Sequence, residues 1–288
     1  MSIFKDKKII WNIFRFLFCL FALIGFVFVC VFVAMQFGLL NVKGSVSERN
    51  SYFDFKKNSK ENVVLPKPTP NWANTDEWKL MKEVFTRDQD IIKKAGEDAG
   101  ISPRLILSGV IGEQFRFFSS RRESFKGYFE PLKILASLSK ISFGIAGLKP
   151  LTVELIEEHL KDSSSPFYLG SQMENVADYS GSVGIDLDVT DERMSRITDA
   201  KNPYYSYLYV GLYMRQVEAQ WKKSGFDIEG RPEILSTLYN LGFPRSIPKA
   251  DPKAGGALIN IGGESYSYGD IGYEFYYSDE LIDVFPRN

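Results

Sequence analysis

Apolar residues recur along most of this chain at the three- and four-residue spacing of amphipathic helices. One such stretch begins near Thr75, and Gly100 closes it. Ser102 and Pro103 then give a start signal, with serine as N-cap and proline at the first helical position. Further helices are predicted over about 130–140, 152–161, 204–223 and 232–241. The pattern therefore predicts a mainly α-helical domain.

Two segments depart from this spacing. Residues 166–188 are rich in Gly, Ser and Asp, which favours irregular structure with room for a short hairpin. Residues 248–288 are rich in Gly and Tyr and are predicted to wrap around the domain. Their tyrosines suit two roles equally, stacking on sugars or packing on the core.

The segment from Phe16 to Leu40 has no charged residue and is long enough to cross a bilayer as a helix. The cationic residues near it are more numerous before it than after it. We therefore predict a single-pass protein of the bacterial inner (cytoplasmic) membrane, with residues 1–15 cytoplasmic and the domain periplasmic or extracellular. Cleavage as a signal peptide is the minority alternative, since no convincing cleavage site follows. Residues 41–74, which end in alternating prolines, are predicted to be an extended linker.

Composition narrows the chemistry of the remaining domain, residues 75–247. The 288 residues, 44% hydrophobic, suffice for one sizeable core, and the net charge of −1 gives no attraction to nucleic acid. Cys19 and Cys30 both lie in the predicted span, and His159 is the sole histidine, in a polar context that favours solvation. Thiol nucleophiles and zinc sites are thereby excluded, and no metal or cofactor is expected. The acidic residues between 186 and 192 do not have EF-hand spacing and are predicted to form a solvated loop.

Glu113 is the candidate catalytic residue. It lies in the apolar helical stretch 105–115, where a carboxylate is unexpected. A carboxyl group in a poorly solvated groove holds its proton near neutral pH, as a general acid requires.

Three motifs follow one another in a fixed order: Glu113 in its helix, then Ser142-Phe-Gly-Ile-Ala-Gly-Leu-Lys-Pro150, then Leu238-Tyr-Asn-Leu-Gly242. In this order they resemble the soluble lytic transglycosylase type of the lysozyme superfamily. That family has a catalytic Glu, a G-L-M-Q-I-x-P segment and an A-Y-N-A-G segment. Residues 207–214 resemble its N-I-x-x-G-x-x-Y-L helix, with Gly211 and Tyr213 matching. The resemblance covers roughly residues 85–245 and implies a lysozyme-like fold.

The chain departs from the family pattern at several positions. Gln114 replaces the usual Ser, Gly147 replaces Gln, Ala146 stands where Met is common and Tyr207 replaces Asn. The connection between Glu113 and the second motif is also longer than usual. These departures indicate a divergent subfamily or one with altered activity.

The resemblance implies that Glu113 acts first as acid and then as base in non-hydrolytic cleavage of the bond between MurNAc and GlcNAc. It implies that Tyr239 donates a hydrogen bond to Glu113 or to the developing charge, and that Asn240 orients the acetamido group. Ser142, Gly144 and Gln114 are assigned to substrate binding. A lytic transglycosylase needs one carboxylate, whereas a hydrolase needs two.

The sequence therefore predicts a membrane-anchored peptidoglycan lytic transglycosylase whose partners are glycan strands, the inner membrane through residues 16–40 and an envelope protein complex. One alternative is a glycan-binding or scaffolding module. Another is a hydrolytic muramidase in which Glu123 or Glu130 supplies the second carboxylate.

Overall fold

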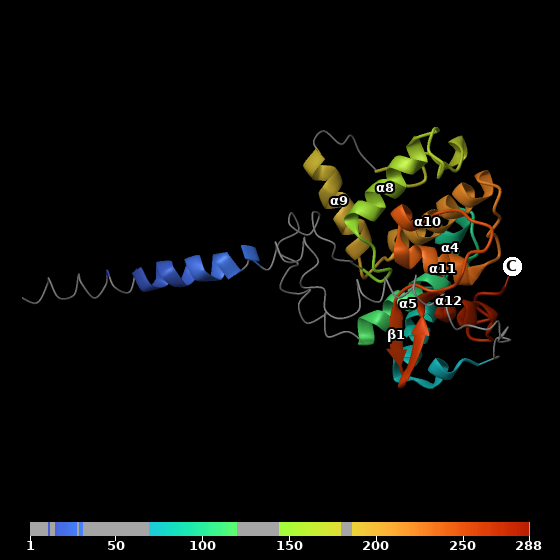
Figure 1. Cartoon of the computed structure of the whole chain (residues 1–288), viewed down its shortest axis with the longest axis horizontal. Coiled ribbons are helices and arrows are strands. Elements are labelled where there is room, and N and C mark those ends of the chain that lie inside the picture. The colour runs from blue at the N-terminus through green and yellow to red at the C-terminus, as the bar shows by residue number, and fades with distance from the viewer. Residues whose placement is uncertain are drawn as a thin grey trace, which may run out of the picture. The chain divides into compact units, whose positions relative to one another are not determined.

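The computed structural model describes residues 11, 15–27, 29–30, 69–119, 144–179 and 186–287. The chain divides into two compact units, Met1–Ser47 and Glu48–Asn288. Figure 1 labels most helices of the second unit and one strand of its small sheet.

In the first unit, residues 15–27, 29 and 30 are helical. Among the described residues, no helix combines the length and the apolar character needed to cross a membrane. The predicted span at 16–40 is therefore contradicted. The single-pass inner-membrane localisation and the cytoplasmic placement of residues 1–15, which were built on that span, are corrected with it.

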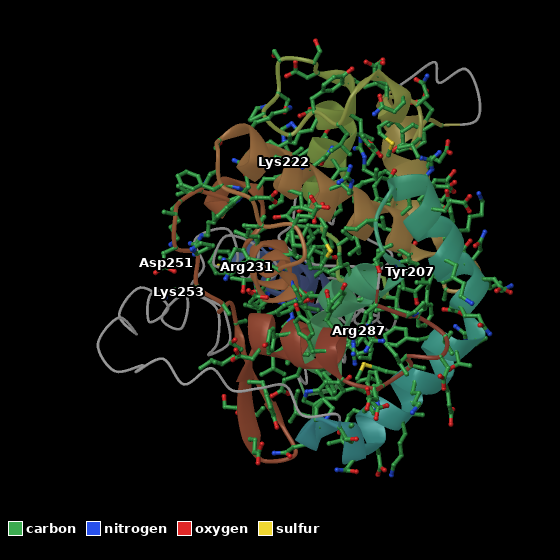
Figure 2. All side chains as sticks on the ribbon, turned by 90° about the vertical axis from the view of Figure 1, so that its right-hand side faces the viewer. Tyr207, Lys222, Arg231, Asp251, Lys253 and Arg287 are labelled. Carbon is green, nitrogen blue, oxygen red and sulfur yellow. The ribbon has the colours of Figure 1, made fainter. Side chains whose placement is uncertain are left out.

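The second unit is mainly α-helical, as predicted. Its α-helices are α3 (Asp76–Arg87), α4 (Gln89–Ala99), α5 (Pro103–Ser119), α8 (Pro150–Lys161), α9 (Asp186–Thr198), α10 (Tyr204–Lys223), α11 (Pro232–Leu241) and α12 (Tyr268–Tyr277). Its 3₁₀ turns are η2 (Asn71–Asn74), η4 (Ser171–Met173) and η5 (Phe243–Arg245). Figure 2 labels the charged side chains of Lys222, Asp251 and Lys253, and all three are exposed.

The boundaries of the early helices follow local signals. The Thr75 side chain accepts a hydrogen bond from Trp78 N at the start of α3. Gly100 ends α4 in the left-handed conformation, with φ of 69°. Pro103 is the first residue of α5, as predicted, but the buried Ser102 hydroxyl has no hydrogen-bond partner among the described residues. The predicted N-cap bond of Ser102 is therefore not formed.

Helix α5 lies at the centre of the unit and contacts α3, α4, α10, α11, α12 and the first strand. Its stretch from Ile106 to Ile111 is buried because neighbouring helices cover it on several sides. Two glycines allow the closest approaches. A Cβ on Gly109 would lie 2.5 Å from Met214 Cε, and one on Gly112 would lie 2.6 Å from Tyr268 Cζ.

The C-terminal segment begins with an antiparallel hairpin of β1 (Leu258–Ile261) and β2 (Glu264–Ser267), in which Leu258 pairs with Ser267. The two glycines between the strands both have positive φ, as a tight hairpin turn requires. Ser267 and Asp270 then form a capping box at the start of α12. Local signals thus set the turn of the hairpin and the first residue of α12.

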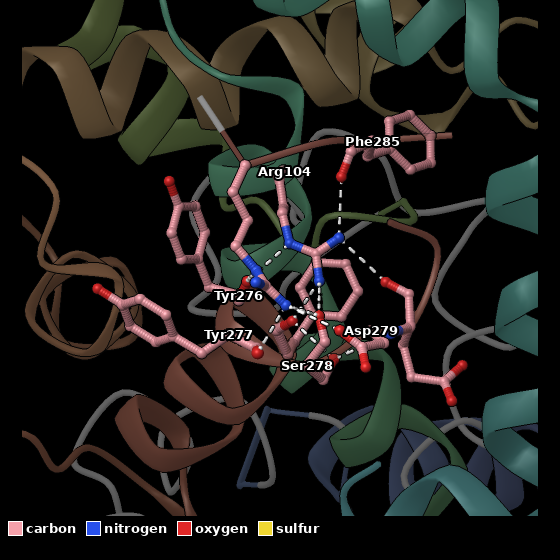
Figure 3. Close-up of polar contacts among 9 residues, drawn as sticks. Arg104, Tyr276, Tyr277, Ser278, Asp279 and Phe285 are labelled. Atoms are coloured by element: carbon pink, nitrogen blue, oxygen red, sulfur yellow. Dashed lines mark hydrogen bonds and ion pairs between the residues drawn. The ribbon is translucent and has the colours of Figure 1, made fainter. Parts of the chain in front are cut away.

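Arg104 of α5 joins this segment to the core. Its guanidinium is fully buried and donates hydrogen bonds to backbone carbonyls of the segment, as drawn in Figure 3. The acceptors are Phe275 O, Tyr276 O, Ser278 O, Glu280 O and Phe285 O, at 2.7–3.0 Å. The guanidinium also lies 4.5 Å from the Phe275 ring. Residues 275–285 are therefore tied to the core through a buried arginine, although Asp279 and Asp283 remain exposed.

Several features differ from the sequence-based predictions. Residues 186–198 form α9 instead of an irregular acidic loop. A hairpin occurs at 258–267, and the described residues 166–179 of the segment predicted to have room for one contain no strand. Residues 71–74, assigned to the linker, form η2, and Trp72 there is 1% exposed. The predicted helix at 130–140 lies outside the described residues.

Candidate active site

Glu113 lies on α5 and is 8% exposed. The apolar sequence around it buries this part of the helix, so the carboxylate is carried into the interior with its neighbours. A charge in such a position needs a partner, because isolated burial is costly.

Arg116 provides that partner. Its Nη2 forms an ion pair with Glu113 Oε2 across one helical turn. The Arg116 side chain is 33% exposed, against 9% for that of Glu113. Solvent therefore reaches the arginine more readily than the carboxylate.

The turn formed by residues 144–147 lies directly against Glu113. Gly147 has φ of 62°, and a Cβ there would lie 2.5 Å from Glu113 Oε2. Any larger residue would be strained by the backbone and would collide with the carboxylate. Glycine is therefore the residue that this position requires in the observed structure.

Two side chains hold the turn in place. Gln114 Nε2 donates to Ile145 O, and Tyr239 Oη of α11 donates to Ala146 O at 2.6 Å. Residues from the three sequence motifs are thus brought together around one carboxylate. Tyr239 bonds to the turn, however, and not to Glu113 as the resemblance implies.

The other end of the turn packs against α9. Gly144 has φ of 68°, and a Cβ there would lie 1.8 Å from Ile197 O. Helix α9 is in turn fixed by Arg193, which donates to Glu157 Oε2 on α8, and by Arg196. The Arg196 guanidinium lies about 4 Å from each of two tyrosine rings, those of Tyr179 and Tyr205. An anchored α9 therefore supports the turn that covers Glu113.

Two phenols complete the surroundings of Glu113. Burial, and then the charge of Glu113, raise the pKa of both Tyr239 and Tyr268 well above the usual value. Tyr268 donates to Gly109 O at 2.9 Å from its position at the start of α12. Both groups therefore stay neutral around neutral pH and are hydrogen-bond donors to the protein.

The other residues that the sequence assigned to the site, Asn240 and Ser142, are not shown in contact with Glu113. Asn240 Oδ1 accepts from Ala257 N at 2.9 Å, so this oxygen holds the C-terminal segment. Ser142 lies outside the described residues. In the fourth motif, Tyr213 donates to Leu238 O at 2.7 Å and supports Tyr239 edge-on at 5.4 Å. Tyr207, labelled in Figure 2, is directed instead to Asp88, 3.3 Å away.

His159 is partly buried rather than solvated. Its ring stacks on Phe167 at 4.6 Å and meets Phe243 edge-on at 5.0 Å, and Nδ1 lies 3.0 Å from Ser165 Oγ. Burial lowers the pKa of His159, with an opposing effect from Asp162. The imidazole is therefore a packing group of the α8 end of the domain.

Sequence reasoning missed Arg116 and Tyr268. Arg116 could have been found, because a cation three residues after a buried acid on a helix faces the same side. Tyr268 gave no comparable signal. It is far from Glu113 along the chain, and only the packing of α12 on α5 brings the two residues close together.

Comparison with protein-family models, with curated proteins and with solved structures gives no match to this chain. The lysozyme-like fold predicted from the resemblance is therefore not shown. Of that fold prediction, the mainly helical character stands.

Proposed function

We propose that this protein is a peptidoglycan lytic transglycosylase that uses Glu113 to cleave the β-1,4 bond between MurNAc and GlcNAc. The observation that carries the proposal is the convergence of three separated motifs on the Glu113 carboxylate. Gly147 touches it, Gln114 and Tyr239 hold the turn that contains Gly147, and this order along the chain is the one that resembles the family.

In the proposed reaction, Glu113 gives its proton to the glycosidic oxygen as the bond from that oxygen to C1 of MurNAc breaks. The N-acetyl group of the substrate assists at C1. The C6 oxygen then bonds to C1, and its proton passes to the Glu113 carboxylate. A 1,6-anhydro ring forms, no water is consumed, and Glu113 is regenerated in its starting form.

The geometry suits a single carboxylate in this role. Glu113 is shielded by the turn and by two neutral phenols, and such shielding strengthens electrostatic interactions in the site. The hydrolytic alternative would need Glu123 or Glu130, and both lie outside the described residues.

The test is incubation of the full chain with purified peptidoglycan, followed by mass analysis of the released muropeptides. We expect products lighter by one water than reducing-end products, and a loss of about 10²- to 10⁴-fold in rate for Glu113→Gln. Glu218→Gln is a matched control, since Glu218 is also 8% exposed and is paired with Arg215 across one helical turn. Reducing-end products would contradict the proposal and favour hydrolysis.

One observation favours a second candidate, a glycan-binding or scaffolding module of an envelope assembly. Polar atoms of Gln114, Tyr239 and Asn240 are all engaged with the protein's own backbone. Binding to intact peptidoglycan without release of any muropeptide would support this candidate over the enzyme.

A further inference from the structure

Helix α9 contacts the candidate site through the carbonyl group of Ile197. A Cβ on Gly144 would lie 1.8 Å from Ile197 O, so the turn of residues 144–147 packs directly on this atom. At the other end of the same turn, Gly147 lies against the Glu113 carboxylate. Because packed interiors transmit displacements, a shift of Ile197 would be passed through the turn to Glu113.

This end of α9 is fixed by Arg196. The buried guanidinium donates to Ala177 O at 2.6 Å and to Asp178 O at 2.7 Å. It also lies 3.9 Å from the ring centroid of Tyr179 and 4.1 Å from that of Tyr205. Cation–π contacts of this kind are stronger where water is excluded. Arg196 therefore joins α9 both to residues 177–179 and to α10.

The rest of α9 offers few comparable attachments. Among the residues of this helix whose burial is described, the buried side chains are those of Met194, Arg196 and Ile197. Arg193 adds an ion pair with Glu157 of α8, but it lies one helical turn further from Ile197. The position of the Ile197 carbonyl thus depends chiefly on its neighbour Arg196.

We infer that Arg196 is a positioning residue for Glu113: by fixing Ile197, it holds the turn of residues 144–147 against the carboxylate. The catalytic role of Glu113 rests on the proposed function, whereas the coupling between Arg196 and Glu113 does not. Loss of the arginine loosens the turn and leaves Glu113 more exposed and less well oriented. A misplacement of about 1 Å in an active site can lower a rate about 10²-fold.

The first experiment measures the accessibility of Glu113 and requires no catalysis. A water-soluble carbodiimide and an amine label the carboxylates of the folded full chain, and peptide mass analysis gives the labelling rate of each one. Glu218 is an internal reference, since it is also 8% exposed. We expect Arg196→Lys to raise the labelling rate of Glu113 by about 10-fold and to leave that of Glu218 unchanged. An equal rise at both positions would mean general loosening and would contradict the inference.

A milder variant is tested beside this one, because a buried arginine also contributes to folding. Ser206 Oγ of α10 donates to Ile197 O at 3.2 Å, so Ser206→Ala frees the same carbonyl without removing a charge. Thr198→Ala is the matched control, since Thr198 Oγ1 donates to Met194 O within α9 itself. Ser206→Ala should raise the labelling of Glu113 by about 3-fold, and Thr198→Ala should not change it. Circular dichroism melts confirm that each variant is folded.

The second experiment measures muropeptide release and separates this inference from the proposed function. We expect Arg196→Lys to lower kcat by about 10- to 100-fold with KM within about 2-fold, because orientation of the acid is lost rather than binding of the glycan. Unchanged labelling of Glu113 in folded Arg196→Lys and Ser206→Ala overturns the inference, whatever the activity. So does an unchanged kcat in Arg196→Lys when Glu113→Gln is inactive. If the wild type releases nothing but the labelling responds as expected, the proposed function fails and the coupling stands.

Discussion

At the scale of single residues, Gly147 and Glu113 act as one fitted pair. The positive φ of Gly147 turns the backbone toward the helix, and the absence of a side chain leaves space for the carboxylate. Both requirements are met by glycine alone, because a Cβ would be strained by the backbone and would overlap Glu113.

We predict that Gly147→Ala costs about 1–3 kcal/mol in the free energy of unfolding and displaces Glu113, with loss of glycan cleavage. Gly230→Ala is the matched control. Gly230 has φ of 70° and no atom within 4 Å of an added Cβ, so it reports the backbone strain alone, about 1 kcal/mol. Urea unfolding measures both values. Equal costs for the two variants would show that Gly147 does not press on Glu113.

His159 gives a residue-scale prediction that depends on pH. Burial lowers its pKa in the folded state, so the unfolded chain binds the proton more readily. The stability contributed by the neutral imidazole is therefore present above pH about 6.5 and is lost as pH falls through the folded-state pKa. Because His159 is the sole histidine, its proton NMR signal can be followed directly. A folded-state midpoint at or above that measured in urea would contradict this.

At the scale of elements, α5 and α12 are joined by Arg104, whose hydrogen-bond acceptors among the described residues are backbone carbonyls. The donors of Arg104 go to carbonyls at and beyond the C-terminal end of α12, where the helix dipole is negative. Burial, and then the nearby charge of Arg287, lower its pKa to about 10, so it remains charged at neutral pH.

We predict that Arg104→Met lowers the free energy of unfolding by about 3–5 kcal/mol, because buried carbonyls lose their donor. Arg287→Met is the control. Arg287 donates to Tyr276 O, Tyr277 O and Ser278 O from a position that is 38% exposed, and its loss should cost about 1 kcal/mol or less. Denaturant unfolding of the two variants tests the difference. Similar losses would mean that the burial of Arg104 has no special importance.

The elements that sequence patterns missed have weak local signals. Helix α9 is mostly polar, and its buried side chains are few, chiefly Met194, Arg196 and Ile197. Helix α12 contains two glycines, which lower helix propensity. They are needed for packing, since a Cβ on Gly272 would lie 2.1 Å from Ser236 Oγ. In both cases tertiary contacts outweigh local preference.

At the scale of the whole molecule, the C-terminal segment of the second unit is hydrogen-bonded to the first helices of the same unit. Trp72 Nε1 donates to Glu274 and Trp78 Nε1 donates to Glu280, at 2.8 and 2.9 Å. The same segment supplies Tyr268 to the surroundings of Glu113. The site is therefore assembled from parts that are far apart along the chain.

The sequence by itself determined the features that depend on near neighbours. Helical periodicity located α8, α10 and α11, and it predicted one continuous helix where the structure has α3 and α4. An acid in an apolar stretch singled out Glu113 as the candidate catalytic residue. The motif order also predicted which segments belong together at the site. The helix predictions succeed because the spacing of apolar residues is a local property of the chain.

Only the tertiary structure decided which polar groups meet. Tyr239 donates to Ala146 O and not to Glu113, and Arg116 forms the ion pair with Glu113. Asn240 accepts a hydrogen bond from Ala257 N. A donor on a folded chain bonds to whichever acceptor packing brings within about 3 Å, and that choice is set by the placement of whole helices. The polar residue types of the candidate site could be identified from the sequence, but their hydrogen-bond partners could not.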